Sequence, residues 1–254
     1  MKPTVNSDSI VVINPPKNPI VIGAISFGAS GLLIAFHVIG VNLLMASFGE
    51  KATAASNVVA TLHSFIISTG VGVLSSASNQ LGVALRSSNE TQEKNETVEA
   101  MIKLGWSGSV TLGFLASVLF LSTKPIMPMI LDEETATFVS DFFVPFALSP
   151  IACFISQTNG TIVFQAEKNW WFPLVTTAAY RIPAVGLGYF LSKSMGMGVP
   201  GIGLGSSIAA WASLLLWKSW FNKEVYSYYN LNAVLNIPSF TTINKKICNE
   251  FFYR

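Results

Sequence analysis

The hydrophobic residues of this chain fall into six long stretches that are almost free of charged residues. Each stretch reaches the ~20 residues that a helix needs to cross a hydrocarbon core about 30 Å thick. The single charge within them is Arg181, in the fifth stretch. The six stretches are residues 18–49, 52–85, 104–123, 142–166, 169–192 and 194–217.

This pattern predicts an all-α membrane protein of six transmembrane helices. Backbone that faces lipid must satisfy its own hydrogen bonds, so only helices or closed barrels span a membrane. The stretches are too long and too continuously apolar for barrel strands, which are about 10 residues long with alternating faces. Composition agrees, because 51% of the residues are hydrophobic and 11% are charged, whereas soluble domains carry about a quarter charged residues.

The sequence as a whole predicts three regions. Residues 1–18 are expected to form a cytoplasmic N-terminal tail, residues 19–225 the six-helix transmembrane lobe, and residues 226–254 a cytoplasmic C-terminal segment. The last segment is too polar to cross the membrane. It places Ile243, Ile247 and Phe251 near helical spacing beside two lysines, so an interfacial helix and an unstructured tail are both open for it.

Lysine and arginine positions predict the orientation. Eleven of the 15 lie in the tail, in the loops after the second and fourth stretches, or in the C-terminal segment, and three lie in the alternate loops. By the positive-inside rule, both termini face the cytoplasm and the chain is a multi-pass protein of the inner (plasma) membrane. The lipid bilayer is thus its first partner, and no nucleic-acid partner is expected.

Polar residues inside the stretches are the candidates for a substrate or ion pathway. At about 1.5 Å per residue, His63 and Arg181 lie near the bilayer midplane and His37 slightly toward the outer side. Asn42 and Gln157 are further polar candidates. Polar groups at such depth normally face a bundle interior or a water-filled cavity. For the two histidines the alternative is a neutral, hydrogen-bonded interior residue.

Arg181 requires a more specific explanation, since a central arginine costs about 2.5–3.5 kcal/mol even on the most lenient insertion scale. Pairing with Asp141 would bridge roughly 8 Å of depth, with the arginine leaning away from it. We therefore favour a cavity lined by Arg181, His37 and His63 over that ion pair.

Enzyme chemistry is not indicated. The sequence has no Walker loop, no nucleotide fingerprint after a strand and no His-Glu-x-x-His motif, and it holds no paired carboxylates inside a stretch. Cys153 and Cys248 do not suggest a disulfide framework or a metal site. We expect no enzyme, no metal and no bound cofactor.

Three stretches together resemble the first six-helix half of multidrug and toxic compound extrusion (MATE) transporters. FGEKATAASNVVATLHSFIISTGVGVLSSASNQLGVALRSSN is similar to the family's first outer loop and long second helix. QAEKNWWFPLVTTAAYRIPAVGLGYFL is similar to its connector into the fifth helix, including the Ile-Pro, and GVPGIGLGSSIAAW is similar to its sixth helix.

This resemblance implies an efflux transporter of the antiporter class for drugs and other organic compounds, driven by a proton or sodium gradient. Family members have two six-helix lobes that rock to alternate access. The chain corresponds to one lobe, so we expect it to need a second one, from another copy in a homodimer or from a separate partner.

The resemblance also implies a changed coupling site. Many bacterial members use a carboxylate on helix one and asparagines on helix five. Val41 falls at the carboxylate position, with Asn42 beside it, and Arg181 and Val185 fall at the asparagine positions. Two alternatives to the exporter stay open: a shortened membrane protein that does not transport, and a helical bundle that handles lipids or anions.

Overall fold

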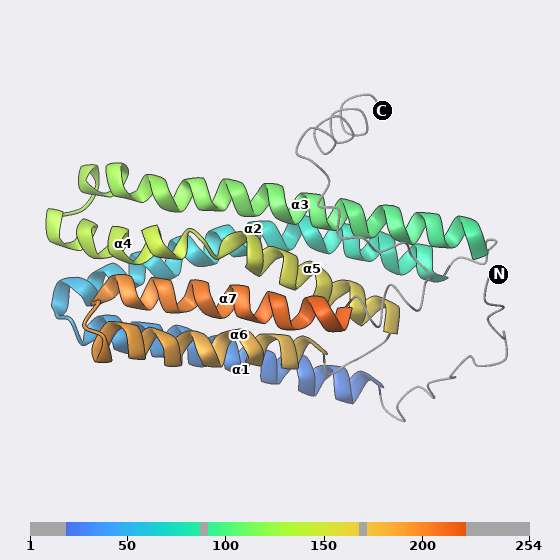
Figure 1. Ribbon diagram of the computed structural model, residues 1–254, viewed down its shortest axis with the longest axis horizontal. Coiled ribbons are helices and arrows are strands. Elements are labelled where there is room, and N and C mark those ends of the chain that lie inside the picture. The colour runs from blue at the N-terminus through green and yellow to red at the C-terminus, as the bar shows by residue number, and fades with distance from the viewer. Residues whose placement is uncertain (1–18, 87–90, 168–171, 222–254) are drawn as a thin grey trace.

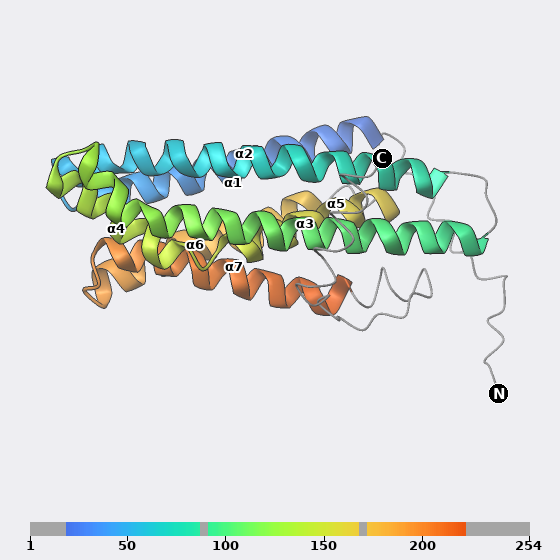
Figure 2. The ribbon, with the colours of Figure 1, turned by 90° about the horizontal axis from the view of Figure 1, so that it is seen from above.

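The computed structural model describes residues 19–86, 91–167 and 172–221, and within these ranges the regular elements are all helical. Figures 1 and 2 show the helices running alongside one another down the long axis of the molecule. The predicted tail, 1–18, and the predicted C-terminal segment, 226–254, lie outside the described residues. The elements are α1 (Pro19–Ala46), α2 (Glu50–Arg86), α3 (Thr91–Ile126), η1 (Met127–Met129), α4 (Glu133–Phe146), α5 (Pro150–Glu167), α6 (Phe172–Tyr189), η2 (Phe190–Ser194) and α7 (Val199–Phe221).

The predicted spans are confirmed in part. Four helical segments are long and apolar enough to cross a membrane, and α4 with α5 makes a fifth if this bent pair is one span. The remaining predicted span coincides with α2, which is less apolar than α1 because it begins with Glu50 and Lys51 and is rich in serine and threonine. The four segments are Ala24–Ala46, Lys103–Met129, Leu174–Ser194 and Val199–Leu216.

The core lies toward the end of the bundle where α1 meets α2, α3 meets α4 and α6 meets α7, on the left in Figure 1. This is the predicted outer end. Its centre is a group of phenylalanines from α3 and α4, of which Phe120 and Phe143 stack with ring centroids 4.5 Å apart. Phe146 packs against both rings at 5.4 Å and 6.4 Å. Such pairs contribute about 0.5–1.5 kcal/mol each beyond their buried area.

The chain bends by 54° between α4 and α5. Pro150 has no N–H to donate to the carbonyl of Phe146, and this interrupts the helical ladder. Ser149 replaces the missing donor: its N–H and its hydroxyl donate to the Phe146 carbonyl at 2.8 Å and 2.7 Å. Two side chains of α7 satisfy further carbonyls at the bend. Ser207 donates to the Pro145 carbonyl and Trp211 to the Leu148 carbonyl, both at 2.7 Å.

Close approach between α6 and α7 depends on glycine. A Cβ atom added at Gly205 would lie 2.7 Å from the carbonyl carbon of Leu187 and would also collide with the backbone nitrogen of Gly188. Small residues allow such close backbone contact in membrane bundles, where dispersion rather than the hydrophobic effect holds helices together. The sequence Gly-Ile-Gly-Leu-Gly-Ser-Ser of α7 therefore serves packing.

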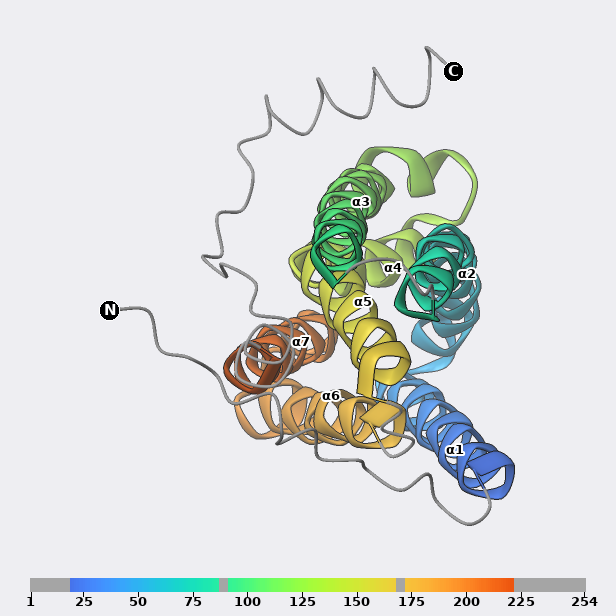
Figure 3. The same ribbon diagram turned by 90° about the vertical axis from the view of Figure 1, so that its right-hand side faces the viewer.

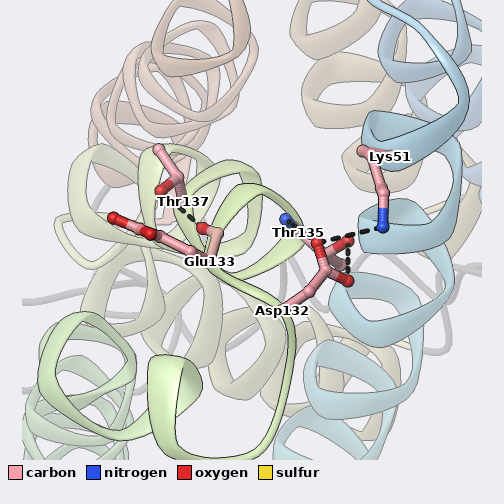
Figure 4. A network of polar contacts seen from close by, with 5 residues as sticks. All are labelled: Lys51, Asp132, Glu133, Thr135 and Thr137. Atoms are coloured by element: carbon pink, nitrogen blue, oxygen red, sulfur yellow. Dashed lines mark hydrogen bonds and ion pairs between the residues drawn. The ribbon is translucent and has the colours of Figure 1, made fainter.

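Polar contacts tie the connections at the predicted outer end (Figure 4). Asp132 caps α4 by accepting from the N–H of Thr135 at 3.1 Å and from its hydroxyl at 2.8 Å. The same carboxylate forms an ion pair with Lys51 of α2 at 3.1 Å. Lys193 of η2 lies 3.8 Å above the ring of Phe48 and donates to the Ser47 carbonyl at 3.4 Å.

We expect Asp132→Asn to lower the melting temperature at about pH 7 and to have little effect near pH 2. Hydrogen bonds from Thr135, together with Lys51, lower the pKa of Asp132 from 3.8 to about 2. A lowered carboxyl pKa stabilises the fold fully above the unfolded value, and this contribution disappears as the pH falls through the folded value. Thermal unfolding of wild type and Asp132→Asn in detergent between about pH 7 and pH 2 measures this difference in melting temperature.

The matched control is Glu134→Gln, which removes a charge from the same helical turn. The side chain of Glu134 makes no hydrogen bond or ion pair within the described part of the chain, so its substitution should change the melting temperature less at neutral pH. A difference between wild type and Asp132→Asn that does not change between about pH 4 and pH 2 contradicts the assignment.

We expect Gly205→Ala to destabilise the protein by about 1–3 kcal/mol, because overpacking forces α6 and α7 apart. The control is Gly186→Ala on α6, where an added Cβ meets nothing within 4 Å and helix propensity favours alanine by up to about 1 kcal/mol. Chemical or thermal unfolding in detergent compares the two. Equal stability of the two variants would show that the α6–α7 approach does not require glycine.

Candidate functional site

Arg181 lies in the middle of α6 and reaches across to α1. Its side chain is half-buried, and its Nη1 lies 3.0 Å from Nδ1 of His37. The two helices approach closely one turn away, where a Cβ added at Gly40 would lie 2.9 Å from a methyl carbon of Val185. This close packing brings two residues that are 144 positions apart into direct contact.

The hydrogen bond determines which nitrogen of His37 carries the proton. A guanidinium group has only N–H donors, so Nδ1 of His37 must accept. The imidazole is then neutral and its proton resides on Nε2, which becomes a donor. His37 is 5% exposed, and its Nε2 is buried and has no partner among the described residues.

Tyr180 completes the immediate surroundings of the pair. The Arg181 guanidinium carbon lies 4.7 Å from the centroid of the Tyr180 ring, a distance typical of a cation–π contact. The Tyr180 and His37 rings are 5.8 Å apart between centroids and tilted by 41°. Tyr180 also packs on a cluster formed by α5 and α7, which includes Cys153. Its aromatic ring therefore holds the guanidinium from one side.

His63 of α2 lies near this pair. It is half-buried, and its ring meets the edge of Phe146 with centroids 5.3 Å apart. It is close enough for a charge on Arg181 or His37 to act on it. Arg181 and His37 are thus in direct contact, and His63 lies within electrostatic range of them.

Asn42 does not join the hydrogen-bonded pair. Asn42 is half-buried on α1 and forms no hydrogen bond with Arg181 or His37. Five positions along a helix separate Asn42 from His37 by about 140° around the axis, which directs them to different faces. Gln157 lies on an exposed part of α5. The sequence analysis did not include Tyr180 among the site residues, although it directly precedes Arg181 in the chain.

The charge of Arg181 is not neutralised by a carboxylate of the described residues. Arg181 forms no ion pair with Asp141; the Asp132 carboxylate pairs with Lys51 at the predicted outer end. An arginine keeps its charge at any physiological pH. Among the described residues no three His, Cys, Asp or Glu side chains gather to bind a metal. The site therefore consists of donors around one permanent positive charge.

The fold is similar to that of known transporters, although no family model and no curated protein sequence matches the chain. A multidrug resistance MATE family transporter of the MOP superfamily, in an outward-facing conformation, matches with a TM-score of 0.72 and 14% identity. A MOP superfamily transporter from Pyrococcus furiosus, whose binding pocket is described as having reverse polarity, matches with a TM-score of 0.68 and 12% identity.

Each match covers 92% of this chain and 51% of the transporter, so the chain spans about half the length of these proteins. At this level of identity the similarity concerns the fold. The resemblance to MATE transporters seen in the sequence is confirmed at that level: the chain has the fold of about half of a MATE/MOP superfamily transporter.

Proposed function

We propose that this chain is one lobe of a membrane transporter that exports drugs or other organic compounds by alternating access. The observation that carries the proposal is the match of nearly the whole chain to about half of a MATE transporter. In such folds substrate binds between or within two lobes that rock against each other. A polar site between α1 and α6, within the apolar part of the bundle, supports the same function.

The proposed membrane arrangement has six spans, formed by α1, α2, α3, the bent pair α4–α5, α6 and α7. Both termini lie in the cytoplasm, and the membrane is the inner (plasma) membrane. Charge distribution along the sequence supports this orientation. The second lobe comes from another copy of the chain or from a further six-helix unit, and transport takes place between the two lobes.

Coupling to protons or sodium, as an antiporter of this class requires, is proposed to lie outside the Arg181 site. Val41, at the position where the family resemblance implies a carboxylate, is 6% exposed and belongs to the apolar core. Val185 packs against Gly40, and Arg181 brings a positive charge. A cation has neither an anionic ligand nor a favourable potential at this place.

We expect cells that express the protein to accumulate several-fold less of at least one dye from a panel of cationic, neutral and anionic compounds. Dye accumulation is compared with that of Gly40→Leu, whose side chain would separate α1 from α6 and should therefore reduce efflux. Gly31→Leu is the matched control and should keep efflux, because a Cβ at Gly31 meets nothing within 4 Å. Membrane content of each variant is measured alongside the efflux.

Oligomeric state in lipid nanodiscs gives the second measurement. A transporter that uses two copies should be dimeric, or should be recovered with another six-helix unit. A strict monomer that moves no dye contradicts the proposal and favours the non-transporting alternative.

A further inference from the structure

We propose that Arg181 and His37 form a binding site for an anionic oxygen group, a carboxylate or a phosphate, carried by the compound that the protein handles. This inference names the substrate class of the proposed transporter and in that respect rests on the proposed function. Binding of the anion itself depends only on the geometry of α1 and α6.

Hydrogen-bonding capacity is the first argument. Arg181 offers five N–H groups, and the hydrogen bond to His37 engages its Nη1. Because Arg181 makes His37 accept at Nδ1, the free proton of the imidazole lies on Nε2, which is buried without a partner. Both side chains therefore hold N–H donors without a described acceptor, and a ligand that supplies acceptors and negative charge would complement them. Carboxylate and phosphate oxygens are the common biological groups of this kind.

The balance of charge is the second argument. Arg181 is half-buried and permanently charged, yet no carboxylate of the described residues pairs with it. The other titratable groups that act on it or lie beside it are His63, Cys153 and Tyr180. At neutral pH an imidazole, a thiol and a phenol ordinarily carry no negative charge. Even a half-buried charge is unfavourable without an opposite charge, and an anionic ligand would supply the negative charge that the described side chains lack.

Tyr180 gives the site a fixed orientation. Its ring lies against the guanidinium group, and the residue also packs against the apolar cluster of α5 and α7. The arginine is thereby restrained from one side by Tyr180 and from another by His37, and less side-chain freedom remains to be lost when a ligand binds. A planar guanidinium held in this way matches the two oxygens of a carboxylate or phosphate.

The anionic group could belong to a soluble organic acid or to a lipid head group, since both present the same oxygens. The test therefore uses protein in nanodiscs of a neutral phosphatidylcholine, titrated with inorganic phosphate or benzoate, and a parallel preparation in which phosphatidylglycerol is added to the lipid. Binding is followed by calorimetry and by the shift of the melting temperature.

We expect at least one of the anions to bind the wild-type protein, and Arg181→Gln to weaken that binding roughly tenfold to a hundredfold, as the loss of charged hydrogen bonds predicts. His37→Asn keeps an acceptor for Arg181 but removes the Nε2 donor, so it should weaken binding by a smaller factor. Arg181→Lys keeps the charge without the planar fork and should fall between wild type and Arg181→Gln.

Two results identify the source of the anion. A response to soluble anions in neutral nanodiscs supports an organic acid or phosphate, and a response only to phosphatidylglycerol supports a lipid head group. The inference is overturned if wild type responds to neither, or if folded Arg181→Gln binds as tightly as wild type. If Arg181→Gln does not fold, the comparison of His37→Asn with wild type decides in the same way.

Dye efflux separates this inference from the proposed function. Protein that exports dyes but binds no anion keeps the transporter proposal and loses the anion site. Protein that binds anions through Arg181 but exports nothing keeps the site and loses the transporter proposal.

Discussion

Polar groups in an apolar interior need partners, and the arrangement of this bundle depends on that requirement. Within the helices, many hydroxyl groups donate back to carbonyls of the preceding turn, as Ser30 does to Ser26 at 2.8 Å and Thr123 to Phe120 at 2.6 Å. At the bend between α4 and α5, the helical hydrogen bonds alone cannot satisfy the carbonyls. Ser207 and Trp211 of α7 then donate across to it, so the bend and the position of α7 depend on each other.

Arg181 poses the same requirement in its most demanding form. The fold meets it with a neutral partner, His37, and an aromatic face, Tyr180. Neither removes the positive charge, and one donor of His37 is buried without a partner as a result. Unsatisfied groups of this kind are rare in native interiors and usually have a functional or structural reason. This is why the α1–α6 contact is the most informative place in the molecule.

At the predicted outer end, exposed polar contacts join the connections between helices. Lys51 joins α2 to Asp132 before α4, and Lys193 joins η2 to the turn after α1. These exposed contacts are individually weak, but together they link the connections of three helical hairpins to one another. The bundle is thus tied at this end and packed closely through glycine between α6 and α7.

Hydrophobic patterning along the chain was sufficient to locate the apolar helices. Six stretches with a single charge among them specify such helices, because the membrane requirement acts on each segment separately. The order of three motifs indicated a MATE-like lobe. The sequence also identified Arg181, His37 and His63 as unusual residues in such segments. The contact of Arg181 with His37, rather than with Asp141, became clear from the packing of α1 against α6. Partner choice depends on the rotation and distance of helices that are far apart in the chain, and local hydrophobic patterns do not contain that information.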